Sequence, residues 1–258
     1  MFAKERHAAI LEMLKEAGSV TTSQLVEAFS VSIETVRRDL LILEENGLLQ
    51  RVHGGAVAMG DMIAFRELPL RMQDNVAQKQ ELCQAAMGFI KNGDTIGVDS
   101  GSTAVLFAEA LKEHFTELTV ITYSLDVFHI LNQHKNFRVI LCGGDYYPTE
   151  NCFVGVLALN MLSSLRVQKV FLFPTAVSLQ HGIFDHESEV LIMQQTLRRI
   201  GSQVYVLADS SKFEHTDLLK QEDMLPGYVY VTDSALPAKL KAMYLENQIQ
   251  IVTGCDVK

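Results

Sequence analysis

Hydrophobic positions near the N-terminus recur at helical spacing and predict two short helices. Ile10, Leu14 and Ala17 lie at i, i+4 and i+7, which places them on one face of the first helix. Thr21 and Gln24 have the spacing of a capping box, so a second helix is expected to begin directly after Thr21. Both helices can bury an apolar stripe against a third element.

A third helix follows Ser32, whose hydroxyl is a natural N-cap. Its two faces differ in character on a helical wheel. Glu34, Thr35 and Arg38 point outward from the first turns, and Arg37 lies on the flank. The opposite face carries four apolar side chains that can pack on the first two helices, namely Ile33, Val36, Leu40 and Leu43.

A short alternating segment then predicts a β-hairpin. Residues 48–52 alternate enough for a strand, and the two glycines that follow permit a tight turn before a return strand. Three helices followed by such a hairpin predict a winged helix-turn-helix domain over residues 1–57, whose third helix enters the major groove of DNA. Arg51 and His53 on the hairpin are placed to contact the DNA backbone or minor groove.

The outward side chains of the third helix suit DNA. Arg38 can bind a guanine with two hydrogen bonds, Thr35 can contact a base or a phosphate, and Arg37 suits a phosphate. The alternative is that the arginines only pair with carboxylates on a solvated helix, here Glu34, Asp39 and Glu45. The hairpin favours DNA binding, and the candidate DNA-binding residues are Ser32, Glu34, Thr35, Arg37, Arg38, Arg51 and His53.

From Val76 onward, apolar strand-like runs alternate with amphipathic helical stretches. Strands are predicted at Thr95–Val98, Thr119–Thr122, Phe137–Cys142, Lys169–Phe173, Val204–Ala208, Tyr228–Thr232 and Gln248–Val252. Helices are predicted at Val105–His114, Asp126–Gln133, Val190–Ile200 and Ala238–Asn247. Repeated βα units predict an α/β domain over residues 76–258, with a mostly parallel sheet covered on both faces. Residues 58–75 are expected to form a linker that packs in part through Phe65 and Leu68.

Loops at the carboxyl ends of these strands carry candidate binding residues, because α/β sheets bind ligands there. Asp99–Thr103, directly before a helix, has the small residues that let backbone N–H groups converge on a phosphate. Thr122–Leu125, which contains Ser124, and Gly143–Gly144 follow two further strands. Lys212 follows a fourth and can neutralise an anion. One such loop is as often an ordinary capped turn, but four together indicate an anionic small ligand.

The composition limits the class of protein. The chain of 258 residues is 48% hydrophobic and has a formal net charge of −9, which gives it material for packed cores but no broad electrostatic grip on nucleic acid. Even residues 1–57 hold six Lys or Arg against eight Asp or Glu, so affinity for random DNA should be modest. The four cysteines form no C-x-x-C pair and no run reaches membrane-spanning length. We therefore expect a cytoplasmic protein with free thiols and no membrane contact.

Two sets of motifs resemble those of the DeoR-type family of bacterial transcriptional regulators. The N-terminal set comprises Val31–Leu40, Leu43–Glu44, Gly47 and Arg51–Ala56. The second set comprises Gly93–Ile96, Asp99–Thr103, Thr122–Leu125, Gly143–Gly144, Val154–Gly155, Asp209–Phe213 and Thr232–Asp233. The resemblance implies an effector domain with a sugar-phosphate-isomerase-like fold and a phosphorylated sugar as its ligand. It also implies that Ser100–Thr103 hold the phosphate and that Lys212 adds charge.

The chain departs from the family pattern at two places. Residues 173–176, Phe-Pro-Thr-Ala, replace a loop that commonly contains glycine, and Leu191 stands where a lysine is usual. Phe173–Thr175 and Leu191 can therefore alter the effector pocket, and no particular sugar is implied. The candidate effector-binding residues are Asp99, Ser100, Gly101, Ser102, Thr103, Ser124, Gly143, Gly144, Glu189 and Lys212.

Two other kinds of site are less favoured. His181, Asp185, His186, Glu187 and Glu189 have no standard metal-ligand spacing, so we interpret them as solvated loop charges and expect neither a metal nor a cofactor. Asp99, Glu189 and Lys212 allow a catalytic alternative, in which a sugar-phosphate isomerase carries a DNA-binding domain. A winged helix gives an enzyme no obvious benefit, which favours a regulator.

These observations predict a sequence-specific transcriptional regulator rather than an enzyme. We favour a repressor of a carbohydrate-metabolism operon, and an activator with the same parts is the alternative. The expected partners are a double-stranded DNA operator and a phosphorylated sugar effector. We also expect a homo-oligomer, because paired half-sites multiply weak individual contacts.

Overall fold

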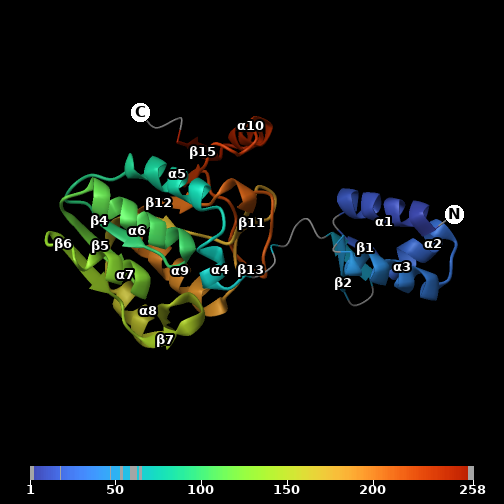
Figure 1. Cartoon of the computed structure of the whole chain (residues 1–258), viewed down its shortest axis with the longest axis horizontal. Helices are drawn as coiled ribbons and strands as arrows, with labels where there is room; N and C mark the ends of the chain where they lie inside the picture. The colour runs from blue at the N-terminus through green and yellow to red at the C-terminus, as the bar shows by residue number, and fades with distance from the viewer. Residues whose placement is uncertain are drawn as a thin grey trace. The chain divides into compact units, whose positions relative to one another are not determined.

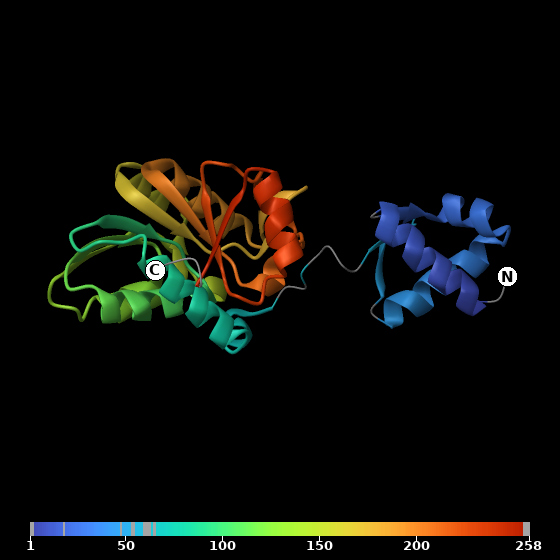
Figure 2. The same cartoon turned by 90° about the horizontal axis from the view of Figure 1, so that it is seen from above.

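A computed structural model of the chain describes residues 3–17, 19–46, 48–52, 55–58, 63 and 66–254. The chain forms two compact units, residues 1–62 and residues 63–258. The first is blue in Figures 1 and 2, and the second runs from teal to red. Each unit has its own core of buried hydrophobic side chains. Within the described residues, no helix has the length and apolar character needed to cross a membrane.

The N-terminal unit combines three helices with a three-stranded antiparallel sheet. The elements are α1 Ala3–Ala17, β1 Ser19–Thr21, α2 Thr22–Phe29, α3 Ile33–Glu45, β2 Leu49–Val52 and β3 Gly55–Ala58, and the strand order is β1-β3-β2. Thr21 and Gln24 form the predicted capping box, and the Thr35 N–H donates to Ser32 Oγ at 3.2 Å. The predicted winged helix-turn-helix is confirmed. Strand β1 was not predicted, because three residues are too few to show alternation.

One face of α3 packs in the core of this unit. Val36, Leu40 and Leu43 are buried as predicted. The predicted burial of Ile33 is wrong, because this side chain is 46% exposed. Side chains tilt toward the N-terminus of a helix, so the side chain of its first residue projects past the end of the packed face.

Asp39 is buried on α3 and holds that helix to α1. Arg6 donates to its carboxylate from Nε at 2.7 Å and from Nη2 at 3.1 Å, and His7 Nε2 lies 2.9 Å from it. Burial opposes ionisation of Asp39, but the hydrogen bonds from Arg6 and His7 outweigh it and hold the pKa of Asp39 below its usual value. The alternative in which Asp39 pairs with the arginines of its own helix is therefore wrong.

The second unit is built on a seven-stranded sheet with the order β15-β14-β12-β9-β4-β5-β6. Its strands are β4 Thr95–Val98, β5 Leu118–Thr122, β6 Phe137–Leu141, β9 Val167–Leu172, β12 Gly201–Leu207, β14 Val229–Thr232 and β15 Gln250–Thr253. All neighbouring pairs are parallel. Each strand lies at a predicted position with its ends shifted by at most three residues. The predicted α/β fold is confirmed.

Helices cover both faces of this sheet (Figure 2). The helices are α5 Val76–Met87, α6 Ser102–His114, α7 Leu125–Leu131, α8 Gly155–Ser163, α9 Ser188–Ile200 and α10 Ala238–Glu246. Buried side chains of α5, α6 and α7 belong to one hydrophobic cluster, and those of α8, α9 and α10 belong to another. The strand order runs from β4 to β5 and β6 in one direction, and from β9 to β12 and β14 in the other. Ligands of such sheets bind where the order reverses, beyond the carboxyl ends of β4 and β9.

Several short elements around this end of the sheet were not predicted. They are β7 Asp145–Tyr147, η1 Pro148–Glu150, β8 Cys152–Val154, β10 Ala176–Ser178, β11 Gly182–Asp185, η2 Ser210–Lys212 and β13 Leu219–Glu222. Segments of three or four residues show no period of their own, and these lie outside the alternation of strands and helices that marks the large sheet. Ile63 and residues 66–75 of the predicted linker belong to the second unit and include α4 Leu68–Arg71. Leu68 is buried as predicted, and Phe65 lies outside the described residues.

Candidate DNA-reading helix and effector cavity

The first turns of α3 present the candidate DNA-reading side chains. Ser32, Glu34, Arg37 and Arg38 are exposed, and Thr35 is half-buried. Arg37 Nη1 lies 2.9 Å from Glu34 Oε1, and these side chains are 58% and 75% exposed, so water screens the pair and a DNA phosphate can displace Glu34. Arg38 forms no ion pair in the part of the chain that the structure describes. Its guanidinium is the freer of the two to reach a base.

The wing, which is the hairpin of β2 and β3, is hydrogen-bonded to α3 through Glu44. The Arg51 backbone N–H donates to Glu44 Oε1 at 2.9 Å, and Arg51 Nη1 lies 3.7 Å from Glu44 Oε2. Arg51 itself is exposed on β2. His53, the other candidate on the wing, lies outside the described residues.

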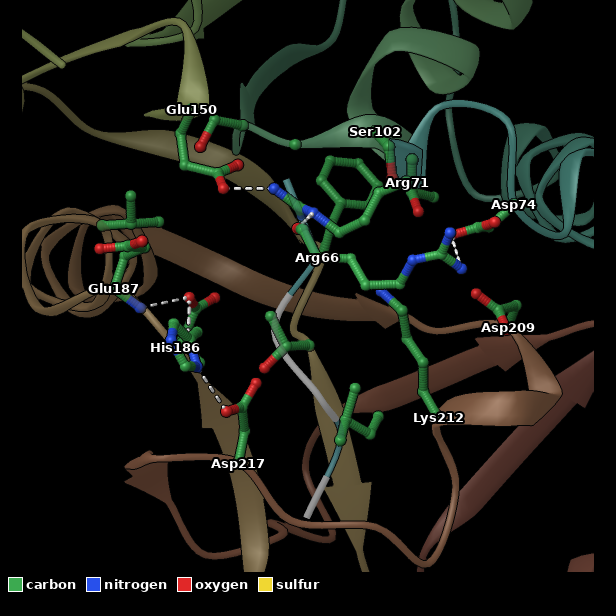
Figure 3. A pocket seen from close by; sticks show the side chains of 18 of the residues that line it. Arg66, Arg71, Asp74, Ser102, Glu150, His186, Glu187, Asp209, Lys212 and Asp217 are labelled. Atoms are coloured by element: carbon green, nitrogen blue, oxygen red, sulfur yellow. Dashed lines mark hydrogen bonds and ion pairs between the residues drawn. The ribbon is translucent and has the colours of Figure 1, made fainter. Parts of the chain in front are cut away.

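A cavity of about 280 Å³ lies in the second unit, beyond the carboxyl ends of three central strands (Figure 3). The segments that follow those strands supply much of its wall. Ser100, Gly101, Ser102 and Thr103 follow β4, Phe173 and Thr175 follow β9, and Asp209, Ser211 and Lys212 follow β12. Gly101 precedes α6 with φ +104°, a conformation that favours glycine. The first N–H groups of α6 have no acceptor within the helix, so they are available to an anion.

Lys79 on α5 is the buried cation of this wall and was missed by the sequence analysis. It is 3% exposed, and its Nζ donates to the Arg71 carbonyl at 2.5 Å and to Ser102 Oγ at 3.1 Å. Burial, reinforced by repulsion from Lys212, lowers the pKa of Lys79 to about 8. Burial also lowers the pKa of Lys212, whose Nζ donates to the Pro174 carbonyl at 2.7 Å. Two poorly solvated amines therefore lie in the wall that contains the N-terminus of α6.

Two arginines from the predicted linker also line the cavity, and neither was foreseen. Arg66 Nη1 lies 2.7 Å from Asp74 Oδ2, and Arg71 pairs with the buried carboxylate of Glu150. Arg71 Nε also donates to the Arg66 carbonyl at 2.8 Å. Figure 3 shows these side chains together with Lys212 in the cavity. With Lys79, four lysine and arginine side chains of the described residues line it.

The cavity wall also contains an acidic group from β11 and the segment before β13. His186 Nδ1 lies 2.9 Å from Asp217 Oδ1, and Tyr147 donates its hydroxyl proton to Glu187 Oε2 at 2.5 Å. That hydrogen bond, together with burial, raises the pKa of Tyr147 to about 12. The interpretation of Asp185, His186 and Glu187 as solvated loop charges is wrong, because β11 pairs with β10 and β13 and brings them into the wall.

Two buried carboxylates share one amide beneath this wall. Gln194 Nε2 donates to Asp99 Oδ2 at 3.0 Å and to Asp185 Oδ2 at 2.8 Å. Burial raises the pKa of Asp99 to about 6 against the hydrogen bonds that favour its ionised form. Burial, together with the nearby charge of Asp99, raises the pKa of Asp185 to about 7. Near neutral pH, Asp185 is thus able to donate or accept a proton at the cavity surface.

Several buried polar atoms on residues that line the cavity have no hydrogen-bond partner among the described residues, including Thr103 Oγ1, Gln194 Oε1 and Asp209 Oδ2. Buried polar atoms are normally hydrogen-bonded, so the cavity wall has unused hydrogen-bonding capacity just below its surface.

Five of the candidate effector residues do not line the cavity. Asp99 is fully buried below it and accepts hydrogen bonds from the backbone of Ser100 at 2.7 Å and Phe173 at 3.0 Å, which joins the β4 and β9 loops. Ser124 caps α7 through the Val127 N–H at 3.3 Å. A Cβ at Gly144 would lie 2.4 Å from the Val154 carbonyl oxygen, so this glycine permits close packing. The other two are exposed, namely Gly143 and Glu189.

The two departures from the family pattern fall in different places. Phe173 and Thr175 line the cavity, whereas Leu191 does not.

Comparison with known proteins places matches on both units. A model of the DeoR-like helix-turn-helix domain matches residues 6–61, and one of the DeoR C terminal sensor domain matches residues 74–234. The lactose phosphotransferase system repressor of Lactococcus lactis subsp. lactis is 31% identical over 255 residues, which cover 98% of each chain. The glycerol-3-phosphate regulon repressor of Escherichia coli (strain K12) is 28% identical and covers 96% of this chain and 97% of its own. Among solved structures, ribose 5-phosphate isomerase A of Methanocaldococcus jannaschii is 19% identical and matches 54% of this chain and 55% of its own with a TM-score of 0.40.

Proposed function

We propose that this chain, which belongs to the DeoR family of transcriptional regulators, represses a carbohydrate-metabolism operon and leaves its operator when a phosphorylated sugar fills the cavity. The exposed side chains of α3 and the wing bind the operator. Both relatives described above are named as repressors, one of a lactose phosphotransferase system and one of a glycerol-3-phosphate regulon. Homo-oligomerisation is part of the proposal, because it presents two reading helices to paired half-sites.

The observation that carries the ligand assignment is the buried amine of Lys79. Its two hydrogen-bond acceptors are a carbonyl and a hydroxyl, both uncharged. Burial and repulsion from Lys212 outweigh the attraction of the amine to Asp209 and Asp74, and a bound phosphate at the N-terminus of α6 reduces that cost. Lys212 adds a second charge. Asp185, Glu187 and Asp217 offer carboxylate oxygens to sugar hydroxyl groups, which is the complement of a sugar phosphate.

The test measures binding to DNA from upstream of the protein's own and neighbouring genes. Fluorescence anisotropy at fixed salt compares these fragments with random DNA, with and without a panel of sugar phosphates and the matching free sugars. We expect at least one fragment to bind more tightly than random DNA by about a thousandfold or more, and one sugar phosphate to weaken that binding while its free sugar does not. Fragments that bind no better than random DNA would refute the regulator, and an equal response to the free sugar would refute the phosphate site.

A matched pair of lysine variants tests whether the effect of the sugar phosphate on DNA binding depends on the cavity. Lys79→Met removes the buried cation and should abolish the response to the sugar phosphate. Lys91→Met removes an exposed lysine that does not line the cavity and should leave the response unchanged. The sign of regulation follows from a reporter fused to the bound promoter, because a repressor raises expression when deleted and an activator lowers it.

An isomerase is the second candidate function, and Asp185 is the observation that favours it. A carboxyl whose pKa is about 7 in a cavity with Lys212 is able to transfer a proton near neutral pH. Incubation with aldose and ketose phosphates distinguishes the two functions. A regulator binds without turnover, whereas conversion of one sugar phosphate into another that is lost in Asp185→Asn would establish catalysis.

A further inference from the structure

The stretch between the two family-matched regions supplies part of the cavity wall. Strand β3 of the wing ends at Ala58, and four residues separate it from Ile63. The Ile63 N–H donates to the Thr216 carbonyl at 2.8 Å, which ties this point of the chain to the segment that contains Asp217. The wall residues of this stretch are Ile63, Arg66 and Arg71, and Asp74 and Asn75 follow it directly. The chain that leaves the DNA-binding unit therefore enters the ligand site directly.

The two arginines of this stretch are held unequally. Arg71 pairs with Glu150, and these side chains are 22% and 7% exposed. Its Nε also binds the Arg66 carbonyl, and its own carbonyl accepts from Lys79. Arg66 and Asp74 are 50% and 30% exposed, so water screens their attraction. Arg71 is therefore held in place, whereas the guanidinium of Arg66 can exchange Asp74 for another anion.

A phosphate in the cavity competes with Asp74 for Arg66. The dianion carries more charge than a carboxylate, and a guanidinium binds it with two parallel hydrogen bonds. The cations proposed to hold the phosphate, Lys79 and Lys212, line the same cavity as Arg66, and Figure 3 shows Arg66 and Lys212 there. Arg71 stays on Glu150 and its Nε holds the Arg66 carbonyl, so a backbone shift that follows the exchange falls on the N-terminal side of Arg66.

We propose that Arg66 couples the ligand to DNA binding. In this scheme, which rests on the proposed function, the phosphate takes Arg66 from Asp74 and pulls the stretch that begins at Ile63 toward the cavity. Ligand regulates only if it favours one arrangement of the DNA-binding unit over another. The exchange at Arg66 supplies that preference, because the displaced stretch leads within a few residues to β3.

The experiment uses the full chain, inorganic phosphate as the probe and the DNA fragment with the highest affinity. Sodium phosphate replaces sodium chloride at constant ionic strength, calorimetry gives phosphate affinity, and anisotropy gives DNA affinity. In the wild type we expect phosphate to weaken DNA binding about fivefold or more. Arg66→Ala should still bind phosphate through Lys79 and Lys212. Phosphate should nevertheless change the DNA affinity of this variant by less than about twofold.

Two further variants separate coupling from a merely structural role. Asp74→Asn frees Arg66, so phosphate should bind about threefold more tightly than in the wild type, a gain that a damaged fold would not give. Arg138→Ala, at an exposed position on β6 outside the cavity, should match the wild type in both measurements.

The outcomes distinguish the inference from the proposed function. If neither phosphate nor any sugar phosphate changes DNA binding by the wild type, the proposed function fails and the inference with it. If the wild type responds and Arg66→Ala responds equally, only the inference is overturned. A wild type that responds to a sugar phosphate but not to inorganic phosphate also overturns it, because Arg66 would then not follow the phosphate group.

Discussion

The amine of Lys79 lies against the N-terminus of α6, with the Arg71 carbonyl and the Ser102 hydroxyl as its acceptors. Because neither acceptor is charged, burial dominates and lowers the pKa of Lys79 to about 8. The protonated amine is thus less stable in the cavity wall than in water, and an anion beside it would stabilise it. In the proposed function, this one residue makes ligand binding and proton binding cooperative.

We predict that affinity for the phosphorylated ligand falls as the pH rises above about 8. Below that pH the Lys79 amine of the free protein is already protonated. Above it the amine is neutral, so binding requires proton uptake and affinity should fall by up to about tenfold per pH unit. Lys212, whose pKa is also lowered, acts in the same direction. Calorimetric titration from about pH 7 to about pH 9 measures the effect.

Lys79→Met provides the control for this pH dependence. The variant should bind the ligand weakly, and its remaining affinity should vary less with pH because one titrating amine is gone. A wild-type affinity that stays constant across the alkaline range would show that Lys79 does not meet the phosphate.

Two neighbouring arginines of α3, Arg37 and Arg38, are expected to make different kinds of DNA contact. Arg38→Ala should lower the preference for the operator over mismatched sequences by about 1–3 kcal/mol if its guanidinium reads a base. Arg37→Ala should weaken binding to every sequence alike and reduce the dependence of log Kd on log salt by about one. Anisotropy on operator, mutated operator and random DNA at several salt concentrations measures both. An equal loss on all sequences for Arg38→Ala would make it a phosphate contact.

The elements of the fold were predicted where the chain marks them locally. Strand β4 was predicted to the residue, because Asp94 and Asp99 bracket an apolar run, and Ser124 was recognised as a cap from the same kind of signal. The hairpin β7–β8 and the small sheet of β10, β11 and β13 are made of equally short strands that lie outside the alternation of strands and helices, so no pattern marked them. Because the prediction did not include these strands, it did not bring the acidic side chains of the cavity wall together.

The cations of the cavity depend on packing between distant segments, so local pattern could not place them together. Lys79 left one signal, because Leu82, Cys83 and Ala86 lie at i+3, i+4 and i+7 from it and are buried, which puts the lysine on an apolar helix face. Arg66 left none. Its position depends on a stretch without regular period that folds against the second unit.

At the scale of the whole molecule, a net charge of −9 makes the affinity for non-specific DNA low. Small changes in the DNA-binding unit are therefore enough to release the protein from an operator. The two units have separate cores, and the cavity lies wholly within the second. Coupling between the ligand and the operator therefore has to pass from one unit to the other, and the chain that joins them is one physical route.

Reciprocity of linkage gives a test of that transmission. If the ligand weakens operator binding by a given factor, typically about 5–150-fold, the operator must weaken ligand binding by the same factor. A fragment that begins at Ile63 retains the cavity but not the reading unit, so operator DNA should not change its ligand affinity. Calorimetric titrations of the full chain with and without operator, and of the fragment, give these constants. Unequal factors in the two directions, or a fragment that responds to DNA, would contradict transmission from the cavity to α3.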